Sequence, residues 1–176
     1  MATTLDRIRI AVTTFDDAEQ LWSMIGGLVD RGIDPTQLCI VATAPAMALL
    51  RRLRPTHDDR TMSAGPHIGS QLADLCEDVE PVCKLRDAKA VLATSGPVLK
   101  LLLGGLARGD TARKLIIDEN SLDPESSLRQ GAPALVVLSN ESAQQRTATQ
   151  MLLRRSQHRV KTFDLALPRE LESQRA

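Results

Sequence analysis

The chain has 176 residues, of which 43% are hydrophobic and 2% aromatic, and its 22 basic residues balance 22 acidic ones. This length suits one domain with one core, and the zero net charge excludes a strong overall attraction to nucleic acid or to an anionic membrane. The first residues lack the apolar core of a signal peptide, and no uncharged apolar run approaches the length of a membrane span. We therefore expect one cytoplasmic domain over residues 1–176, with neither a nucleic-acid nor a membrane partner.

The N-terminal part of the chain predicts a strand, a helix and a second strand. Residues 7–13 alternate and then become apolar, which is typical of a strand, and the compact apolar segment 38–43 predicts the next one. Between them, apolar residues recur at helical spacing after Asp16 and Glu19, which fit a capping box. The glycines at 26–27 disfavour a helix interior, so we expect a neighbouring segment to pack close to the helix backbone there.

The middle of the chain, residues 44–133, is predicted to be mainly helical with one extra strand. That strand is expected at 88–93, where the apolar run is followed by a turn at 94–97 that leads into a helix. Residues 79–85 stay ambiguous, because a strand there would have to place Pro81 at the edge of a sheet.

The C-terminal part predicts a second strand–helix–strand unit and is the clearest structural pattern in the sequence. Residues 135–138 form a short apolar run that predicts a buried strand. Residues 141–157 contain neither Gly nor Pro, and their apolar positions recur at helical spacing, which predicts an amphipathic helix. Residues 160–165 predict a further extended segment.

These elements predict an α+β fold, with ferredoxin-like βαβ units at both ends of a largely helical middle. In such a fold the two units form an antiparallel sheet with helices on one face. The expected divisions of the single domain are a βαβ half at 7–43, the middle at 44–133, a βαβ half at 134–165 and a tail at 166–176. The alternative is an α/β doubly wound parallel sheet, which the strand-to-helix alternation through residues 38–107 favours.

Two long phrases resemble the bacterial general-stress-protein family. TTFDDAEQLWSMIGGLVDRGIDPTQLCIVAT is similar to the opening strand, helix and strand of that family, and LRQGAPALVVLSNESAQQRTATQMLLRRSQHRV is similar to its closing unit. The phrases cover less than half of the chain, and the middle departs from the longer Gly-rich segment of the family. The resemblance implies ferredoxin-like half-units flanking an apolar middle, and it implies no catalytic residues.

The strongest candidate for ligand binding is the turn Thr94, Ser95 and Gly96. Its hydroxyls and backbone N–H groups are placed at a predicted helix start, where the helix dipole favours an anion. The similar turn at Thr43 offers one hydroxyl and no Gly, so it is the weaker candidate. The competing interpretation is a helix cap, which we expect because the sequence contains no phosphate-binding Gly pattern.

No metal site, disulfide or cofactor is expected. The three histidines and three cysteines follow no metal-ligand spacing. They are His57, His67, His158, Cys39, Cys76 and Cys83. No nucleophile motif singles out a catalytic residue, so the sequence favours a protein that is not an enzyme.

Two basic clusters could contact phosphates, and solvated helix ends are the expected explanation of both. One comprises Arg51, Arg52, Arg54 and Arg60, and the other comprises Arg154, Arg155, His158, Arg159 and Lys161. We therefore expect a non-enzymatic interaction or stress-associated module that forms a homo-oligomer, most simply a homodimer. The alternative is a small-molecule (anion) binding or enzymatic domain that uses the turn at 94–97.

Overall fold

The computed structural model describes most of both ends of the chain and parts of its middle. The described residues are 7–53, 79–84, 89–100, 103, 131–156 and 158–166. The strands are β1 (Arg7–Thr14), β2 (Leu38–Thr43), β3 (Val79–Lys84), β4 (Lys89–Ala93), β5 (Ala134–Ser139) and β6 (Lys161–Ala166). The helices are α1 (Ala18–Val29), the 3-10 helix η1 (Pro35–Gln37), α2 (Ala44–Arg52), α4 (Pro97–Lys100) and α7 (Ser142–Arg155).

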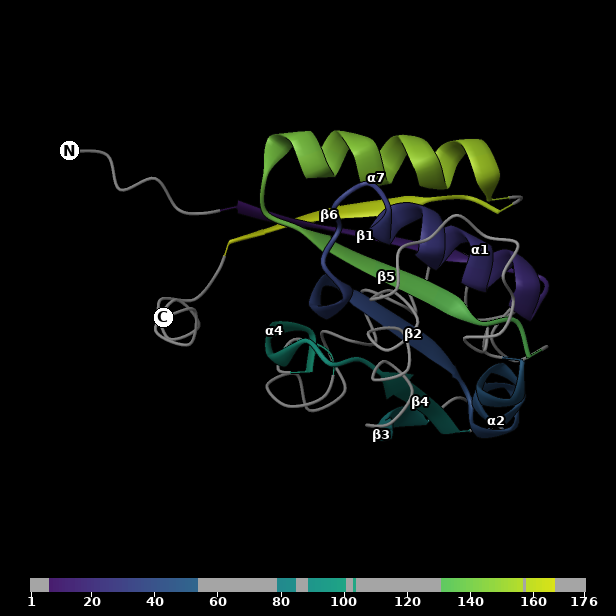
Figure 1. Cartoon of the computed structure of the whole chain (residues 1–176). Helices are drawn as coiled ribbons and strands as arrows, with labels where there is room; N and C mark the ends of the chain where they lie inside the picture. The colour runs from purple at the N-terminus through teal and green to yellow at the C-terminus, as the bar shows by residue number, and fades with distance from the viewer. Residues whose placement is uncertain are drawn as a thin grey trace.

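The strands form one six-stranded sheet in the order β3-β4-β2-β5-β1-β6 (Figure 1). Every neighbouring pair in this sheet is antiparallel. The α+β prediction is therefore confirmed. The alternative of a doubly wound parallel sheet is wrong for the described strands. β2 and β4, the two strands followed by the strand-to-helix turns that suggested it, pair with each other in antiparallel orientation.

The two strand–helix–strand units interleave in the sheet. β5 lies between β1 and β2, and β1 lies between β5 and β6. Each unit therefore contributes one of its strands to the space between the two strands of the other unit. The register is fixed by pairs such as Ala11 with Val137 and Ile40 with Leu135. This arrangement makes β1 and β5 the central pair of the four end-derived strands.

The middle of the chain extends the sheet on the β2 side. β4 pairs with β2, and β3 pairs with β4 and is the last strand in the order. The middle thus contributes two strands to the sheet, where the sequence predicted one at 88–93 and left 79–85 undecided. Pro81 lies in the terminal strand, and the register shifts between Pro81 and Cys83. An edge strand has one side without a neighbour, so it tolerates a residue that lacks a backbone N–H. The edge position therefore allows the segment to form a strand although it contains Pro81.

One face of the sheet packs against α1, α2 and α7, which belong to the same hydrophobic core. Figure 1 shows α1 and α7 side by side across the sheet, and residues of the two helices are in contact. From α7, the core takes Ala148, Met151 and Leu152, which lie at helical spacing within the predicted amphipathic segment. From the sheet, it takes alternate residues of the central strands, such as Leu135 and Val137 of β5. Fully burying one such aliphatic side chain contributes about 1.5–3 kcal/mol.

The opposite face of the central strands is buried as well. All six residues of β2 and all six of β5 are buried. On β1, the residues that alternate with the helix-facing ones, Ile8, Ile10 and Val12, are each at most 2% exposed. Two-sided burial explains why β2 and β5 are continuous apolar runs, whereas a strand with one solvent-exposed face would alternate.

The helix boundaries differ slightly from those predicted. The N-cap of α1 is Asp17, whose carboxylate accepts a hydrogen bond from the backbone N–H of Gln20 at 2.7 Å. The predicted cap, Asp16, instead contacts His158. The helix predicted over 141–157 runs from Ser142 to Arg155. These shifts of one or two residues fall where several acidic or polar side chains could each serve as a cap.

The two glycines inside α1 have different surroundings. A Cβ atom at Gly27 would lie 3.0 Å from Cε of Met151 and 3.3 Å from Nη1 of Arg155, so α7 approaches the α1 backbone there as predicted. A Cβ atom at Gly26 would meet no described residue within 4 Å, so within the described part of the chain the prediction is wrong at that position. Only Gly27 has a packing reason to lack a side chain.

We expect Gly26→Ala to stabilise the protein by about 0.5–1 kcal/mol, because Ala gains helix propensity and meets no neighbour. Gly27→Ala should gain less, since Met151 and Arg155 must move to accept the methyl group. Chemical denaturation of the two variants would measure both changes. A larger gain at Gly27 than at Gly26 would contradict the close packing of α1 and α7.

Candidate functional site

The turn after β4 uses its hydroxyl and N–H groups within the protein. Thr94 is 0% exposed. Its Oγ1 donates a hydrogen bond to the backbone oxygen of Leu38 at 2.6 Å and accepts one from the N–H of Gly96 at 3.0 Å. Pro97 has no N–H to offer. The hydroxyl of Thr94 therefore ties the turn to the start of β2, and Ser95 is the half-buried member of the predicted trio.

Gly96 lies against the backbone of η1. A Cβ atom at this position would lie 1.9 Å from the carbonyl oxygen of Thr36 and 2.9 Å from its carbonyl carbon. No side chain fits in that space, because the neighbouring atoms belong to the main chain. Gly is required here for close approach between two segments that are distant in sequence, and this requirement is independent of any ligand.

The structure does not bring Thr43 to this turn. Thr43 ends β2 and pairs with Ala90, whereas Leu38, which accepts the bond from Thr94, begins β2. The two ends of β2 are about 17 Å apart at the usual rise of a strand. Thr43 precedes α2 as its N-cap and makes no side-chain cap hydrogen bond. The predicted candidates therefore do not form one site; the helix that follows the turn, α4, is described over Pro97–Lys100.

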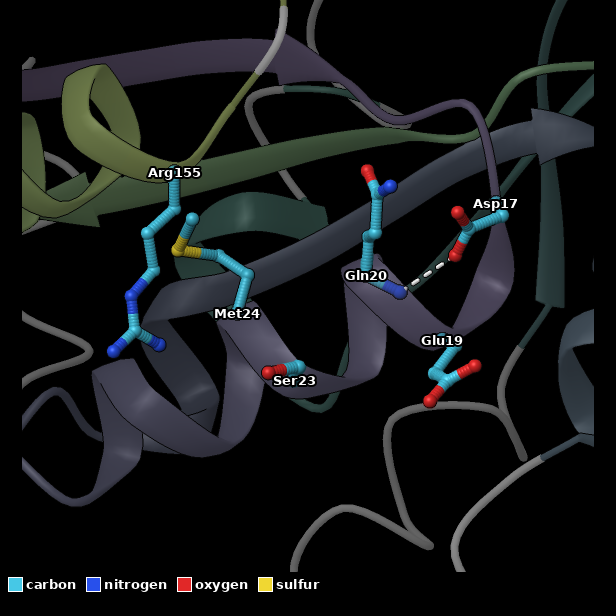
Figure 2. A pocket seen from close by; sticks show the side chains of 6 residues that line it. All are labelled: Asp17, Glu19, Gln20, Ser23, Met24 and Arg155. Carbon is cyan, nitrogen blue, oxygen red and sulfur yellow. Dashed lines mark hydrogen bonds between the residues drawn. The ribbon is translucent and has the colours of Figure 1, made fainter.

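Two open hollows are lined by Arg155 of α7. One lies along α1, and the other lies along α7 and the turn that follows α1. The first has a volume of about 460 Å³ and includes the acidic residues Asp17 and Glu19 of the α1 start. Figure 2 shows Arg155 extending beside Met24 of α1. At the start of the same helix, the Asp17 carboxylate accepts a hydrogen bond from the backbone N–H of Gln20. Arg155 thus lies at the positive end of a hollow whose other end is negative.

The second hollow has a volume of about 540 Å³ and is strongly basic. It is lined by Arg31, Thr147, Gln150, Met151, Arg154 and Arg155. Arg154 and Arg155 belong to a basic cluster that the sequence indicates. Arg31 does not, because it follows α1 and reaches the hollow only through the packing of α1 on α7. Sequence analysis therefore missed this group of three arginines.

The rest of the C-terminal basic cluster is distributed over other contacts. Nε2 of His158 lies 2.7 Å from Oδ1 of Asp16, which joins the end of α7 to the start of α1. The backbone oxygen of Arg159 accepts a 3.5 Å hydrogen bond from the buried hydroxyl of Thr13. Lys161 lies in β6, the edge strand. The contacts of His158 and Arg159 thus join the C-terminal strand–helix–strand unit to the N-terminal one. The other two histidines, His57 and His67, lie outside the described residues.

The edge strand β6 is joined to β1 by an ion pair. The guanidinium group of Arg9 contacts both carboxylate oxygens of Asp164, at 2.7 and 3.1 Å. This hydrogen bonding raises the pKa of Arg9 above its ordinary value. Because Arg9 and Asp164 are directly opposed in the antiparallel register, the pair fixes the alignment of β6.

Cys39 is free and fully buried in β2, and burial raises the pKa of its thiol above the ordinary value. A thiol held protonated in this way is a poor nucleophile. Cys76 lies outside the described residues. Within the described part of the chain, no group of three or more His, Cys, Asp or Glu side chains is placed to hold a metal ion.

None of the helices in the described segments is both long and apolar enough to cross a membrane. No protein-family model, curated protein or solved structure matches the chain.

Proposed function

We propose that the chain is a non-enzymatic interaction module that forms a homodimer through one face of α2. The observation that carries this proposal is the exposure of Leu49 on this helix and of Leu53, its C-cap residue. Leu49 is 53% exposed and Leu53 is 55% exposed. They are four residues apart and therefore adjacent on the helix surface.

The exposed face of α2 is apolar up to its last turn, where exposed Arg52 follows Ala48 by four residues and Leu49 by three. Pro45 and Ala48 are exposed as well. Pro45 precedes Ala48 by three residues and Leu49 by four, so the three residues share one face of the helix. We call Pro45, Ala48, Leu49 and Leu53 the α2 face. On its other side, α2 is anchored by buried Met47 and Leu50, and the backbone oxygen of Leu50 accepts a hydrogen bond from Nε1 of Trp22. The α2 face is thus presented on a helix that is fixed to the core.

A second copy of the chain suits this face better than a partner of different chemistry. The small side chains are in the first half of the face and the large ones are in the second half. In an antiparallel pair related by a two-fold axis, Leu49 and Leu53 of each copy would pack over Pro45 and Ala48 of the other. Arg51 and Arg52 would then lie beside the uncharged first half of the partner helix, so like charges would not face each other.

The proposal includes a ferredoxin-like core made of β1, β2, β5 and β6. The interleaved order of these strands and the placement of α1 and α7 against one face support it. It also includes a cytoplasmic location and a role under stress, which the resemblance of the two end units to general stress proteins supports. Neither property depends on the α2 face.

We expect the protein to have twice the monomer mass in light scattering coupled to gel filtration across the micromolar range. Leu49→Glu combined with Leu53→Glu should reduce the mass to that of the monomer, because buried carboxylates without partners would be placed in the interface. The matched control is Leu153→Glu on α7, where the leucine is 61% exposed. This control should keep the dimer mass.

Circular dichroism should show an unchanged fold for all three substitutions, because each replaced leucine is already more than half exposed. A monomeric wild-type protein would contradict the proposal, as would a dimer that survives the double substitution.

A further inference from the structure

We infer that the basic hollow between α7 and the turn that follows α1 binds a small molecule that carries phosphate groups. Three guanidinium groups, those of Arg31, Arg154 and Arg155, line this hollow of about 540 Å³. The hydroxyl of Thr147 and the amide of Gln150 add neutral hydrogen-bonding groups to the same lining. This inference is independent of the proposed dimer, which uses the α2 face.

The three arginines are not neutralised by the described protein. Among the residues that the structure describes, the ion pairs that join Arg9 to Asp164 and His158 to Asp16 lie outside the hollow, and its lining contains no carboxylate. A lone exposed arginine is solvated, but here one arginine of the turn after α1 and two of α7 bring three like charges to one hollow. A bound anion would relieve their mutual repulsion.

The chemistry of the lining favours phosphate over a single carboxylate. A guanidinium group presents paired N–H donors that match two oxygens of a phosphate, and several such groups around one hollow suit a multiply charged anion. The volume falls within the range of roughly 300–1,000 Å³ that is usual for small-molecule sites, and it exceeds what one phosphate would fill. A diphosphate or a phosphate attached to a larger organic body therefore fits best.

Arg155 is positioned by the packing of the two helices. The place of a Cβ atom at Gly27 lies 3.3 Å from its Nη1, so the guanidinium group lies over a part of α1 that has no side chain. Beyond Arg155, the neighbouring hollow is lined by Asp17 and Glu19, whose carboxylates repel anions. The phosphate end of the ligand is thus directed to the side of Arg31 and Arg154.

Isothermal titration of the full chain with inorganic pyrophosphate tests the inference. We expect saturable binding that weakens as salt concentration rises. Arg31→Gln combined with Arg154→Gln should weaken binding at least tenfold. The matched control is Arg146→Gln, which removes an exposed arginine from the same helix outside the hollow and should change the dissociation constant less than twofold. Absence of saturable binding, or an equal loss in the control, would overturn the inference.

Two further arms separate the possible sources of the phosphate. Adenosine diphosphate should bind at least as tightly as pyrophosphate if the organic body contributes contacts. Vesicles containing an anionic phospholipid should not retain the protein. Retention on the vesicles without binding of pyrophosphate or the nucleotide would assign the arginines to a lipid surface and overturn the small-molecule inference.

Discussion

A chain that ends at Gln130 is expected not to fold. It lacks β5, α7 and β6, and β5 is the strand that joins β1 to β2. All six residues of β5 are buried, and each aliphatic side chain among them contributes about 1.5–3 kcal/mol. Together with the buried residues of α7, this loss is as large as the typical stability of a domain, about 5–15 kcal/mol. Thermal denaturation followed by circular dichroism should show no cooperative transition.

Two point variants test whether the buried residues of the C-terminal unit contribute the stability that the shortened chain would lose. Leu135 of β5 is 0% exposed, so Leu135→Ala should cost about 2–5 kcal/mol. Leu153 of α7 is 61% exposed, so Leu153→Ala should change stability by less than about 0.5 kcal/mol. A shortened chain that still melts cooperatively would mean that β1 and β2 fold without the strand between them.

The elements at both ends of the chain could be predicted because their burial leaves a local pattern. β2 and β5 are buried on both faces and are continuous apolar runs, whereas α1 and α7 each bury one stripe at helical spacing. Periodicity reports which side of an element is buried. It does not report which strand is the neighbour, so the position of β5 between β1 and β2 could not be read from these patterns.

The middle of the chain was harder to predict for a related reason. Pro81 and the irregular register of β3 weaken the strand pattern, and the pairing with β4 is what makes the segment a strand. The prediction that such a strand must lie at a sheet edge is confirmed by the strand order. Whether residues 79–85 form a strand or a loop depended on their pairing with β4, and periodicity does not identify a pairing partner.

The candidate sites show the same limit. The turn at 94–97 has the residue types of both a ligand site and a cap, and the deciding contacts come from Thr36 and Leu38, more than fifty positions away. The basic hollow combines Arg31 with two arginines of α7 in the same way. Residue types can thus be recognised along the sequence, but their convergence depends on helix and strand packing.

Gly96→Ala is expected to destabilise the protein by about 3 kcal/mol, near the upper end of the usual cost of overpacking. The added Cβ atom would lie 1.9 Å from the carbonyl oxygen of Thr36, and a backbone atom cannot rotate away as a flexible side chain would. Either η1 or the turn must move, which would also strain the 2.6 Å bond from Thr94 to Leu38. Urea denaturation would measure the change in the free energy of unfolding.

Two neighbouring variants distinguish this packing role from a capping or ligand role. Thr94→Val should cost about 1–3 kcal/mol, because it leaves the N–H of Gly96 and the oxygen of Leu38 without the hydroxyl that now bonds both. Ser95→Ala should cost less than about 0.5 kcal/mol, since the hydroxyl that holds the turn belongs to Thr94. If Ser95→Ala were the most damaging of the three, the close approach of Gly96 to Thr36 would not be what fixes the turn against β2.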